Sequence, residues 1–168
     1  DFGTFLNNTI TTNGTNSNGI RLSYPTYSNL SGNIFNTTSA NAIYLNHDTL
    51  GVRNNYIDNT NLQQGEQILF YFNQSDLVVE DLTDVGQIIV LDSINLTFTN
   101  ISLDKNGFTF LFTNDSRVEE SIINLSTQQV QMEYSNSNNF TNSVFEVGGS
   151  GYAVSLTTYS SENLFDNN

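Results

Sequence analysis

The chain has 168 residues, 37% of them hydrophobic and 12% aromatic, so a single domain of this length can bury a core. Seventeen acidic residues against four Lys and Arg give a formal net charge of −13, which repels phosphate backbones and anionic lipids and argues against nucleic-acid binding. The sequence has no cysteine, which excludes disulfides and Cys-ligated metals, and no apolar run approaches the roughly 18 residues of a membrane span, so we expect no membrane insertion.

A short alternating apolar phrase recurs along the chain. Its first residues are separated by 23, 25, 20, 20, 22 and 22 positions and are Ile20, Ile43, Ile68, Ile88, Phe108, Val130 and Tyr152. The alternation predicts strands with one inward face, for example Ile68, Phe70 and Phe72. A weaker second phrase follows each first one, and the spacing is too short for βαβ units. The pattern predicts an all-β, single-domain parallel β-helix of about seven coils of 20–25 residues over residues 1–168.

The stretch 18–36, followed by Ala42–Leu45 and Asn54–Ile57, resembles the right-handed parallel β-helix repeat family. This architecture is shared by pectate-lyase-like enzymes, phage tailspikes, NosD-like periplasmic proteins and archaeal and bacterial surface proteins. The resemblance covers most of residues 7–165 and implies a right-handed coil, but an architecture does not define an activity. The alternative fold, a β-sandwich pilin completed by a donor strand, does not explain the recurrence.

The location of the protein is predicted from its polar composition and its N-glycosylation sequons. A start at Asp1 without Met fits a processed secreted chain, and 27 Asn suit amide ladders at β-helix corners. We therefore expect an extracellular or cell-surface protein. Ten Asn-x-Ser/Thr sequons support this, although a chain so rich in these residues also produces them by chance. Asn100 is better explained as a ladder residue. The candidate N-glycosylation sites are Asn13, Asn29, Asn36, Asn73, Asn95, Asn114, Asn124 and Asn139.

The sequence shows no convincing arrangement of catalytic residues. A uronate lyase needs a basic cluster, which four scattered cations do not provide, and a glycoside hydrolase needs carboxylates facing one groove. Acids concentrate at Asp76, Glu80, Asp81, Asp84 and Asp92, with Asp104 about one coil later. Asp81, Asp84 and Asp104 are weak candidate Ca²⁺ ligands, but a solvated acidic loop is the favoured explanation.

Two further motifs do not support an enzyme. The single histidine, His47, is followed by Asp48, which is more typical of a surface pair than of a catalytic triad. The glycine-rich turn at residues 148–151 has no helix after it, as a phosphate cradle would require. We predict no catalytic residues, no cofactor and no enzymatic activity.

The repeat register also places apolar side chains on the outer face. Strands stacked in register would gather them into one exposed stripe, which is typical of a partner interface. The alternative is that a long loop, residues 58–66, covers the stripe. The six residues are Tyr44, Leu69, Tyr71, Ile89, Leu91 and Leu111.

The two ends read like further parts of the repeat. Residues 1–8 and 162–168 carry no capping helix pattern, and uncapped β-helix ends favour stacking of another copy. We expect end-to-end contacts through Phe2, Phe5, Leu6, Leu164 and Phe165. The predicted function is a non-enzymatic, glycosylated filament or adhesin-like subunit whose partner is itself. The alternatives are a β-helix that binds surface glycans or cleaves a polysaccharide, and a tailspike fragment that trimerises laterally.

Overall fold

A computed structural model describes residues 3–14, 17–23, 27–38, 40–46, 53–125, 130–147 and 152–168. The named elements of this part of the chain are all β-strands, β1 to β21. Parallel strands stack into a β-solenoid of about six turns, which confirms the all-β parallel β-helix and corrects the count of seven.

The strands form five sheets. An eight-stranded sheet, called the spanning sheet below, runs the length of the molecule in the order β2 (Thr9–Thr12), β5 (Ile34–Thr37), β8 (Leu62–Gln63), β9 (Glu66–Phe72), β11 (Val85–Leu91), β14 (Phe108–Leu111), β17 (Val130–Glu133) and β20 (Val154–Thr157). Two sheets accompany its first strands: β1 (Gly3–Leu6), β4 (Ser28–Ser31) and β7 (Tyr56–Ile57), and β3 (Ile20–Ser23) with β6 (Ile43–Asn46). Two others accompany its later strands: β10 (Val78–Glu80), β12 (Thr97–Thr99), β15 (Arg117–Glu119), β18 (Asn139–Thr141) and β21 (Leu164–Asp166), and β13 (Ser102–Leu103), β16 (Ile122–Leu125) and β19 (Val144–Val147).

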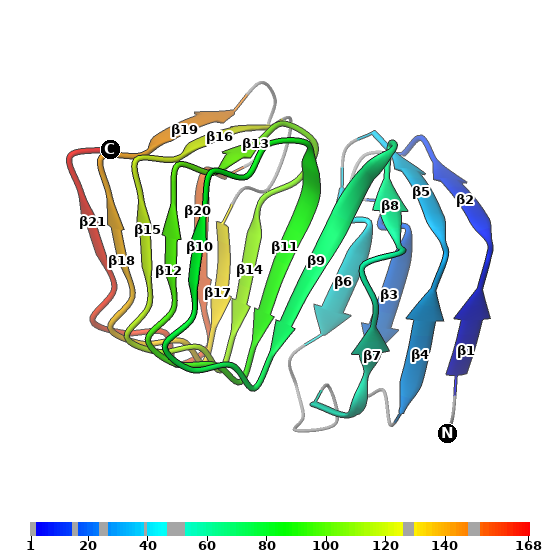
Figure 1. The fold of residues 1–168 in the computed structure, drawn as a ribbon, viewed down its shortest axis with the longest axis horizontal. Helices are drawn as coiled ribbons and strands as arrows, with labels where there is room; N and C mark the ends of the chain where they lie inside the picture. The colour runs from blue at the N-terminus through cyan, green and yellow to red at the C-terminus, as the bar shows by residue number, and fades with distance from the viewer. Residues whose placement is uncertain are drawn as a thin grey trace.

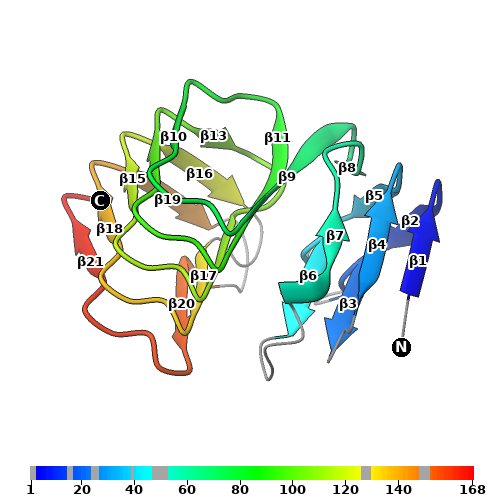
Figure 2. The same cartoon turned by 60° about the horizontal axis from the view of Figure 1, so that its bottom comes forward.

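The chain reverses direction between β8 and β9, which pair antiparallel. Gln64 and Gly65 connect them with φ values of 50° and 92°, and positive φ at both central residues is what a two-residue type I′ hairpin requires. The described residues up to Gln63 form an N-terminal half, and those from Glu66 onward form a C-terminal half. Figures 1 and 2 show the two halves side by side with β9 between them.

The two halves cover opposite faces of the spanning sheet. On β11, Ile88 and Val90 belong to one apolar cluster, whereas Ile89 and Leu91 belong to another. Alternate residues of a strand point to opposite faces, so this part of the sheet is buried on both sides. The first cluster, the C-terminal core, fills the C-terminal half around Phe98, Phe108 and Phe110. The second, the shared core, combines residues of both halves, including Leu30, Phe35, Ile43, Leu45, Ile68, Ile89, Leu91 and Leu111.

The predicted register is wrong by one residue at β9. Leu69 and Tyr71 pair with Ile88 and Val90 and pack against the C-terminal core, whereas Ile68, with Phe70 and Phe72, lies at the shared core. A slip of one position exchanges the two faces of a strand. The pairing with β11 shifts between Val85 and Gln87, across Gly86, where an added Cβ would lie 2.8 Å from the Gln63 Cβ.

The predicted rungs at Ile20 and Ile43 also do not continue into those of the C-terminal half. They form their own two-stranded sheet, β3 with β6. The chain reversal separates this sheet from the later coils, so the recurrence that the sequence shows spans two stacks rather than one.

Sharp corners shape each coil of the C-terminal half. Five ten-residue segments, 73–82, 92–101, 112–121, 134–143 and 159–168, each have positive φ, between 49° and 57°, at their first, fourth and ninth positions. Left-handed residues bend the chain sharply and are tolerated best by Asn and Asp, which occupy nine of these fifteen positions. The repeated corners place β10, β12, β15, β18 and β21 in register.

Candidate interaction surfaces

The expected apolar stripe is not exposed. Ile89, Leu91 and Leu111 are each 0% exposed and lie in the shared core with Ile20 and Ile43 of β3 and β6. The prediction of a surface stripe is therefore wrong for these three residues, because the N-terminal half covers that face of the sheet. The alternative cover, residues 58–66, is likewise not what packs there: the shared core draws mainly on β3 to β7.

The other three stripe residues are half-buried. Leu69 and Tyr71 pack against the C-terminal core, and burial raises the pKa of the Tyr71 hydroxyl. Tyr44 is covered in part by Arg21, whose guanidinium carbon lies 5.3 Å from the ring centroid. The six residues therefore do not form one continuous exposed stripe.

The residues expected at the ends have mixed exposure. Leu6 is 49% and Leu164 is 53% exposed, as stacking surfaces require. Phe5 is half-buried against the shared core. Phe165 is half-buried, with its ring stacked 4.8 Å from that of Phe140. Phe2 lies outside the described residues.

An aromatic column runs along one corner of the C-terminal half. The Phe112 and Tyr134 rings stack 4.8 Å apart, and Tyr159 follows at 5.5 Å. The guanidinium carbon of Arg53 lies over the Phe112 ring, 5.0 Å from its centroid. Tyr159, at the last coil, is 81% exposed, so the column ends in an open aromatic surface.

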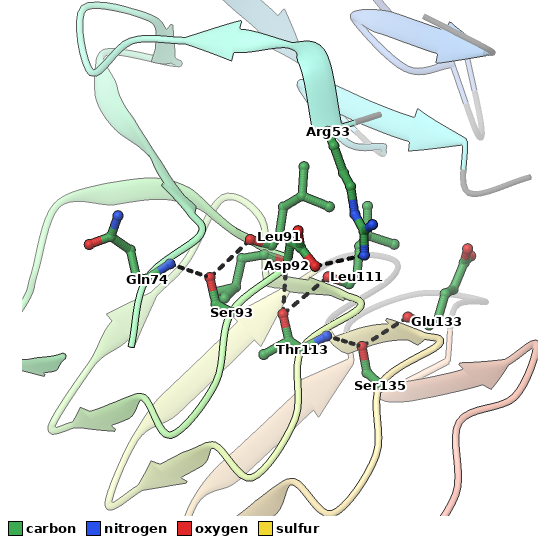
Figure 3. A network of polar contacts seen from close by, with 10 residues as sticks. Arg53, Gln74, Leu91, Asp92, Ser93, Leu111, Thr113, Glu133 and Ser135 are labelled. Atoms are coloured by element: carbon green, nitrogen blue, oxygen red, sulfur yellow. Dashed lines mark hydrogen bonds and ion pairs between the residues drawn. The ribbon is translucent and has the colours of Figure 1, made fainter. Parts of the chain in front are cut away.

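Hydroxyl ladders join successive coils beside this column (Figure 3). The Gln74 N–H donates to Ser93 Oγ at 3.1 Å, and Ser93 Oγ donates to the Leu91 carbonyl of its own coil at 2.9 Å. The Thr113 N–H donates to Ser135 Oγ in the same way, at 3.1 Å. Arg53 forms an ion pair with Asp92 at 2.7 Å, which ties the N-terminal half to this corner.

Amide ladders do the same with two bonds between coils. Asn33 Oδ1 accepts from the Asn8 N–H at 3.1 Å, and Asn33 Nδ2 donates to the Phe5 carbonyl at 2.8 Å. In the C-terminal half, Asn138 Oδ1 accepts from the Ser116 N–H at 3.0 Å, and its Nδ2 donates to the Thr113 carbonyl at 2.8 Å. The sequence predicted ladder asparagines, and these buried ones are confirmed.

The candidate glycosylation residues differ in accessibility. Asn13, Asn29, Asn73, Asn95 and Asn124 are exposed, whereas three are half-buried: Asn36, Asn114 and Asn139. A glycan is attached to the amide nitrogen, so a sequon with a free Nδ2 is the better acceptor.

Hydrogen bonds further distinguish the candidate glycosylation residues. Asn95 Nδ2 donates to Asp76 Oδ1 at 2.6 Å, and Asn114 Oδ1 accepts from the Asn136 N–H at 2.9 Å. Asn100 Nδ2 donates to Asp81 Oδ1 at 2.7 Å, so Asn100 is a ladder residue as predicted. Among the described contacts, Asn13, Asn29, Asn73 and Asn124 are the exposed candidates whose Nδ2 is not held by such a bond.

The candidate Ca²⁺ ligands do not converge. Asp104 pairs with Lys105 at 2.7 Å, and Asp81 accepts the hydrogen bond from Asn100. Asp84 lies just before β11, with Thr83 Oγ1 at 3.3 Å from its Oδ2. Among the residues that the structure describes, no three His, Asp or Glu side chains are arranged to hold a metal ion.

A polar junction joins the two halves beside the β8–β9 hairpin. Burial, followed by the nearby Asp104 carboxylate, raises the pKa of Glu66 even though Lys105 Nζ lies 3.3 Å away. The hydrogen bond with Asp104 raises the pKa of Lys105. The junction also holds Gln87, which is 0% exposed: its Oε1 accepts from the Ile43 N–H at 3.1 Å and its Nε2 donates to the Ile43 carbonyl at 2.9 Å.

Several sequence motifs lie outside the described residues, namely His47, Asp48 and the glycines of 148–151. No described helix has the length and apolar character needed to cross a membrane. No protein-family model, curated protein or solved structure matches the chain. The fold therefore defines the class: a parallel β-solenoid whose two halves share one sheet.

Proposed function

We propose that this chain is a non-enzymatic structural protein of the cell exterior, glycosylated at its exposed sequons, that assembles by stacking the solenoid of one copy on that of the next. The observation that carries the proposal is the open edge of the coil formed by β20 and β21. The sequons, and a polarity supplied largely by uncharged residues that include 27 Asn, support the extracellular setting.

Within the C-terminal half, each coil is completed by the one that follows it. The N–H groups of Ser135, Asn138 and Ser143 donate to side-chain oxygens one coil later, on Ser160, Asn163 and Asn168 respectively. Within the described residues, the N–H groups of these three acceptors have no corresponding partner. A further coil would supply the missing oxygens, and the proposal assigns that coil to a second copy.

Exposed apolar residues lie at the same edge. Leu156 and Leu164 are 47% and 53% exposed, and Tyr159 is 81% exposed. The spanning sheet provides the matching edge at β2, beside the exposed Leu6. Because β8 and β9 pair antiparallel, β2 and β20 of one copy run in opposite directions, and the two halves lie on opposite faces of the spanning sheet. The second copy is therefore turned by a half rotation about the stacking axis, so that its β2 runs parallel to β20 and its first coil lies on the same face as β21. Such a head-to-tail contact does not close and produces a filament.

Electron microscopy of the negatively stained chain at several concentrations tests this assembly. Fibres of uniform width, increasing with concentration, are expected. Leu164→Lys on the edge strand β21 should abolish them, because it places a charge in the contact. Ile122→Lys is the matched control: Ile122 is 52% exposed, against 53% for Leu164, but lies on β16, between β13 and β19. Monodisperse particles at all concentrations, or equal loss with both variants, would contradict the proposal.

The alternative, glycan binding or polysaccharide cleavage, is favoured by one observation: the aromatic column that ends at the exposed ring of Tyr159. Aromatic faces suit sugar rings, which present apolar C–H groups. Retention of the chain on immobilised polysaccharide, lost with Tyr159→Ala, would favour binding. Product formation from a uronate polymer, followed by absorbance and abolished by Asp81→Asn or Asp84→Asn, would overturn the non-enzymatic proposal.

A further inference from the structure

The chain reversal leaves a strand edge open in the middle of the molecule. β10 is the first strand of its five-stranded sheet and pairs on one side only, with β12. The Leu77 carbonyl accepts from the Thr97 N–H at 2.9 Å, and the Asp81 N–H donates to the Thr99 carbonyl at 3.1 Å. Backbone groups alternate in direction along a strand, so those of Val78 and Glu80 point away from β12, where no described strand pairs with them.

This edge exists because the N-terminal half crosses to the opposite face of the spanning sheet. The β1, β4 and β7 sheet ends at β7 and is not continued by β10. The edge is therefore distinct from the terminal edges at β2 and β20.

Apolar surface accompanies the open edge. Leu69 and Tyr71 of β9, with Leu77 and Leu82 on either side of β10, pack against the C-terminal core but are only partly buried. Val78 points outward and is 57% exposed. An added strand whose alternate residues are apolar would cover this end of the core while bonding to β10.

The acidic residues around the open edge of β10 indicate the charge of the segment that would bind there. Asp76, Glu80, Asp81 and Asp84 are all exposed, and no ion pair to any of them is present among the described residues. Arg53 and Lys105 are engaged elsewhere, with Asp92 and with Asp104 and Glu66. Pairing of β10 with β10 of a second copy would bring the same four acids to both sides of the contact, which like-charge repulsion disfavours, and every other segment of a second copy belongs to a chain with the same net charge of −13.

We propose that the free edge of β10 binds an extended segment of a partner protein in which apolar residues alternate with Lys or Arg. Its backbone pairs with Val78 and Glu80, its apolar side chains cover Leu69 and Tyr71, and its cations meet the acids at the two corners. This partner site goes beyond self-assembly and uses a different edge.

Fluorescence anisotropy with a short labelled peptide of alternating Lys and Val tests the site on the intact chain. We expect binding that weakens with salt, whereas a peptide of alternating Glu and Val should not bind. Val78→Pro removes an outward N–H without breaking the ladder to β12 and should weaken binding about tenfold. Val78→Thr keeps that N–H and should bind like the unchanged chain.

Two triple variants distinguish an effect of the acids at the β10 edge on peptide binding from an effect of the net charge of the chain. The test variant combines Asp76→Asn, Glu80→Gln and Asp81→Asn. The control combines Asp115→Asn, Glu119→Gln and Glu120→Gln, the same positions of the corner repeat beside β15, which has strands on both sides. Each changes the net charge from −13 to −10 by removing three acids.

Two measurements decide the outcome. Weaker peptide binding with the test triple alone, together with slower amide exchange at residues 78 and 80 when peptide is bound, would establish the site. Equal weakening with both triples, unchanged exchange at these amides, or no binding of the Lys-Val peptide would overturn it. The triple variants retain every backbone group, so they remain informative if Val78→Pro fails to fold.

Discussion

The N-terminal half and the first coils of the C-terminal half hold their coils together with different side chains, whereas the last coils of the C-terminal half use amides as well. In the N-terminal half, Asn33 and Asn61 bond to the preceding coil through both the oxygen and the nitrogen of the amide. In the C-terminal half, Ser93 and Ser121 accept one bond from the preceding coil and donate to their own coil. An amide thus makes two bonds between coils where a hydroxyl makes one.

The two halves also differ in the number of residues per coil. In the N-terminal half, the two residues joined by a ladder hydrogen bond are 25 or 28 positions apart in the sequence. In the first coils of the C-terminal half, they are 19 or 20 positions apart. Repeated left-handed corners keep the shorter coils in register. In the longer coils of the described N-terminal half, only Asn7 and Gly32 repeat a left-handed corner one coil apart, and buried amides supply more of the register. The comparison shows that corner geometry and buried amides can each hold coils of one solenoid in register, and that the last coils of the C-terminal half combine them.

The largest effect is expected from opening a cavity in either core. Phe98, in the C-terminal core, and Phe35, in the shared core, are both 0% exposed. Phe98→Ala and Phe35→Ala should each lower the free energy of unfolding by about 3–5 kcal/mol. Because the shared core contains residues of both halves, we expect one unfolding transition in each variant, measured by calorimetry and by denaturant titration. A second transition in Phe35→Ala alone would show that the halves unfold separately.

The next largest effect concerns the junction. The Gln87 amide pairs with both backbone groups of Ile43 and so occupies the place of a further strand beside β6. Gln87→Leu would leave a buried N–H and carbonyl unpaired and should cost about 2–4 kcal/mol in a urea titration. Gln67→Leu, at an exposed position on β9, is the control and should change little. Equal stability of the two variants would mean that water replaces the amide.

The all-β solenoid was predictable because alternating apolar residues recur at nearly constant spacing. The exposed stripe was wrongly predicted because that reasoning assumed one buried face. The run Ile88-Ile89-Val90-Leu91 is apolar at every position, which is typical of a strand buried on both faces. This signal was present in the sequence and would have pointed to a covering layer.

The chain reversal and the corners were harder to predict. Gln64-Gly65 is not one of the typical hairpin pairs, in which Asn, Asp or Gly comes first, and β8 has only two residues, too few to show alternation. Left-handed corners at Asn and Asp follow from residue type, whereas those at Phe112, Tyr134 and Glu120 do not. Which sheet edges stay open, including that of β10, depends on the reversal and therefore could not be read from the repeat.

A smaller effect should distinguish the two kinds of ladder. Asn33→Ala removes both bonds to the preceding coil and leaves the part-buried Asn8 N–H and Phe5 carbonyl without these partners, so we expect a loss of about 2–3 kcal/mol. Ser121→Ala removes one acceptor, for the Ile101 N–H, and should cost about 1 kcal/mol. Urea titration of both variants measures the difference. If the serine variant lost as much as the asparagine variant, the proposed advantage of the amide would be wrong.

The smallest effect, a pH dependence at the junction, would show whether charge opposes the contact between the halves. Because burial and Asp104 raise the pKa of Glu66 above its ordinary value of 4.5, the folded chain binds this proton more tightly than the unfolded chain. The stability from this carboxyl is therefore complete below pH 4.5 and decreases as the pH rises through the raised pKa. Glu66→Gln, which stays neutral, should raise the melting temperature slightly at pH 7.5 and leave it unchanged near pH 4. Glu80→Gln, at an exposed position, controls for the loss of one negative charge. An equal gain at both pH values, or the same profile in the control, would show that the Lys105 pair already compensates the buried charge.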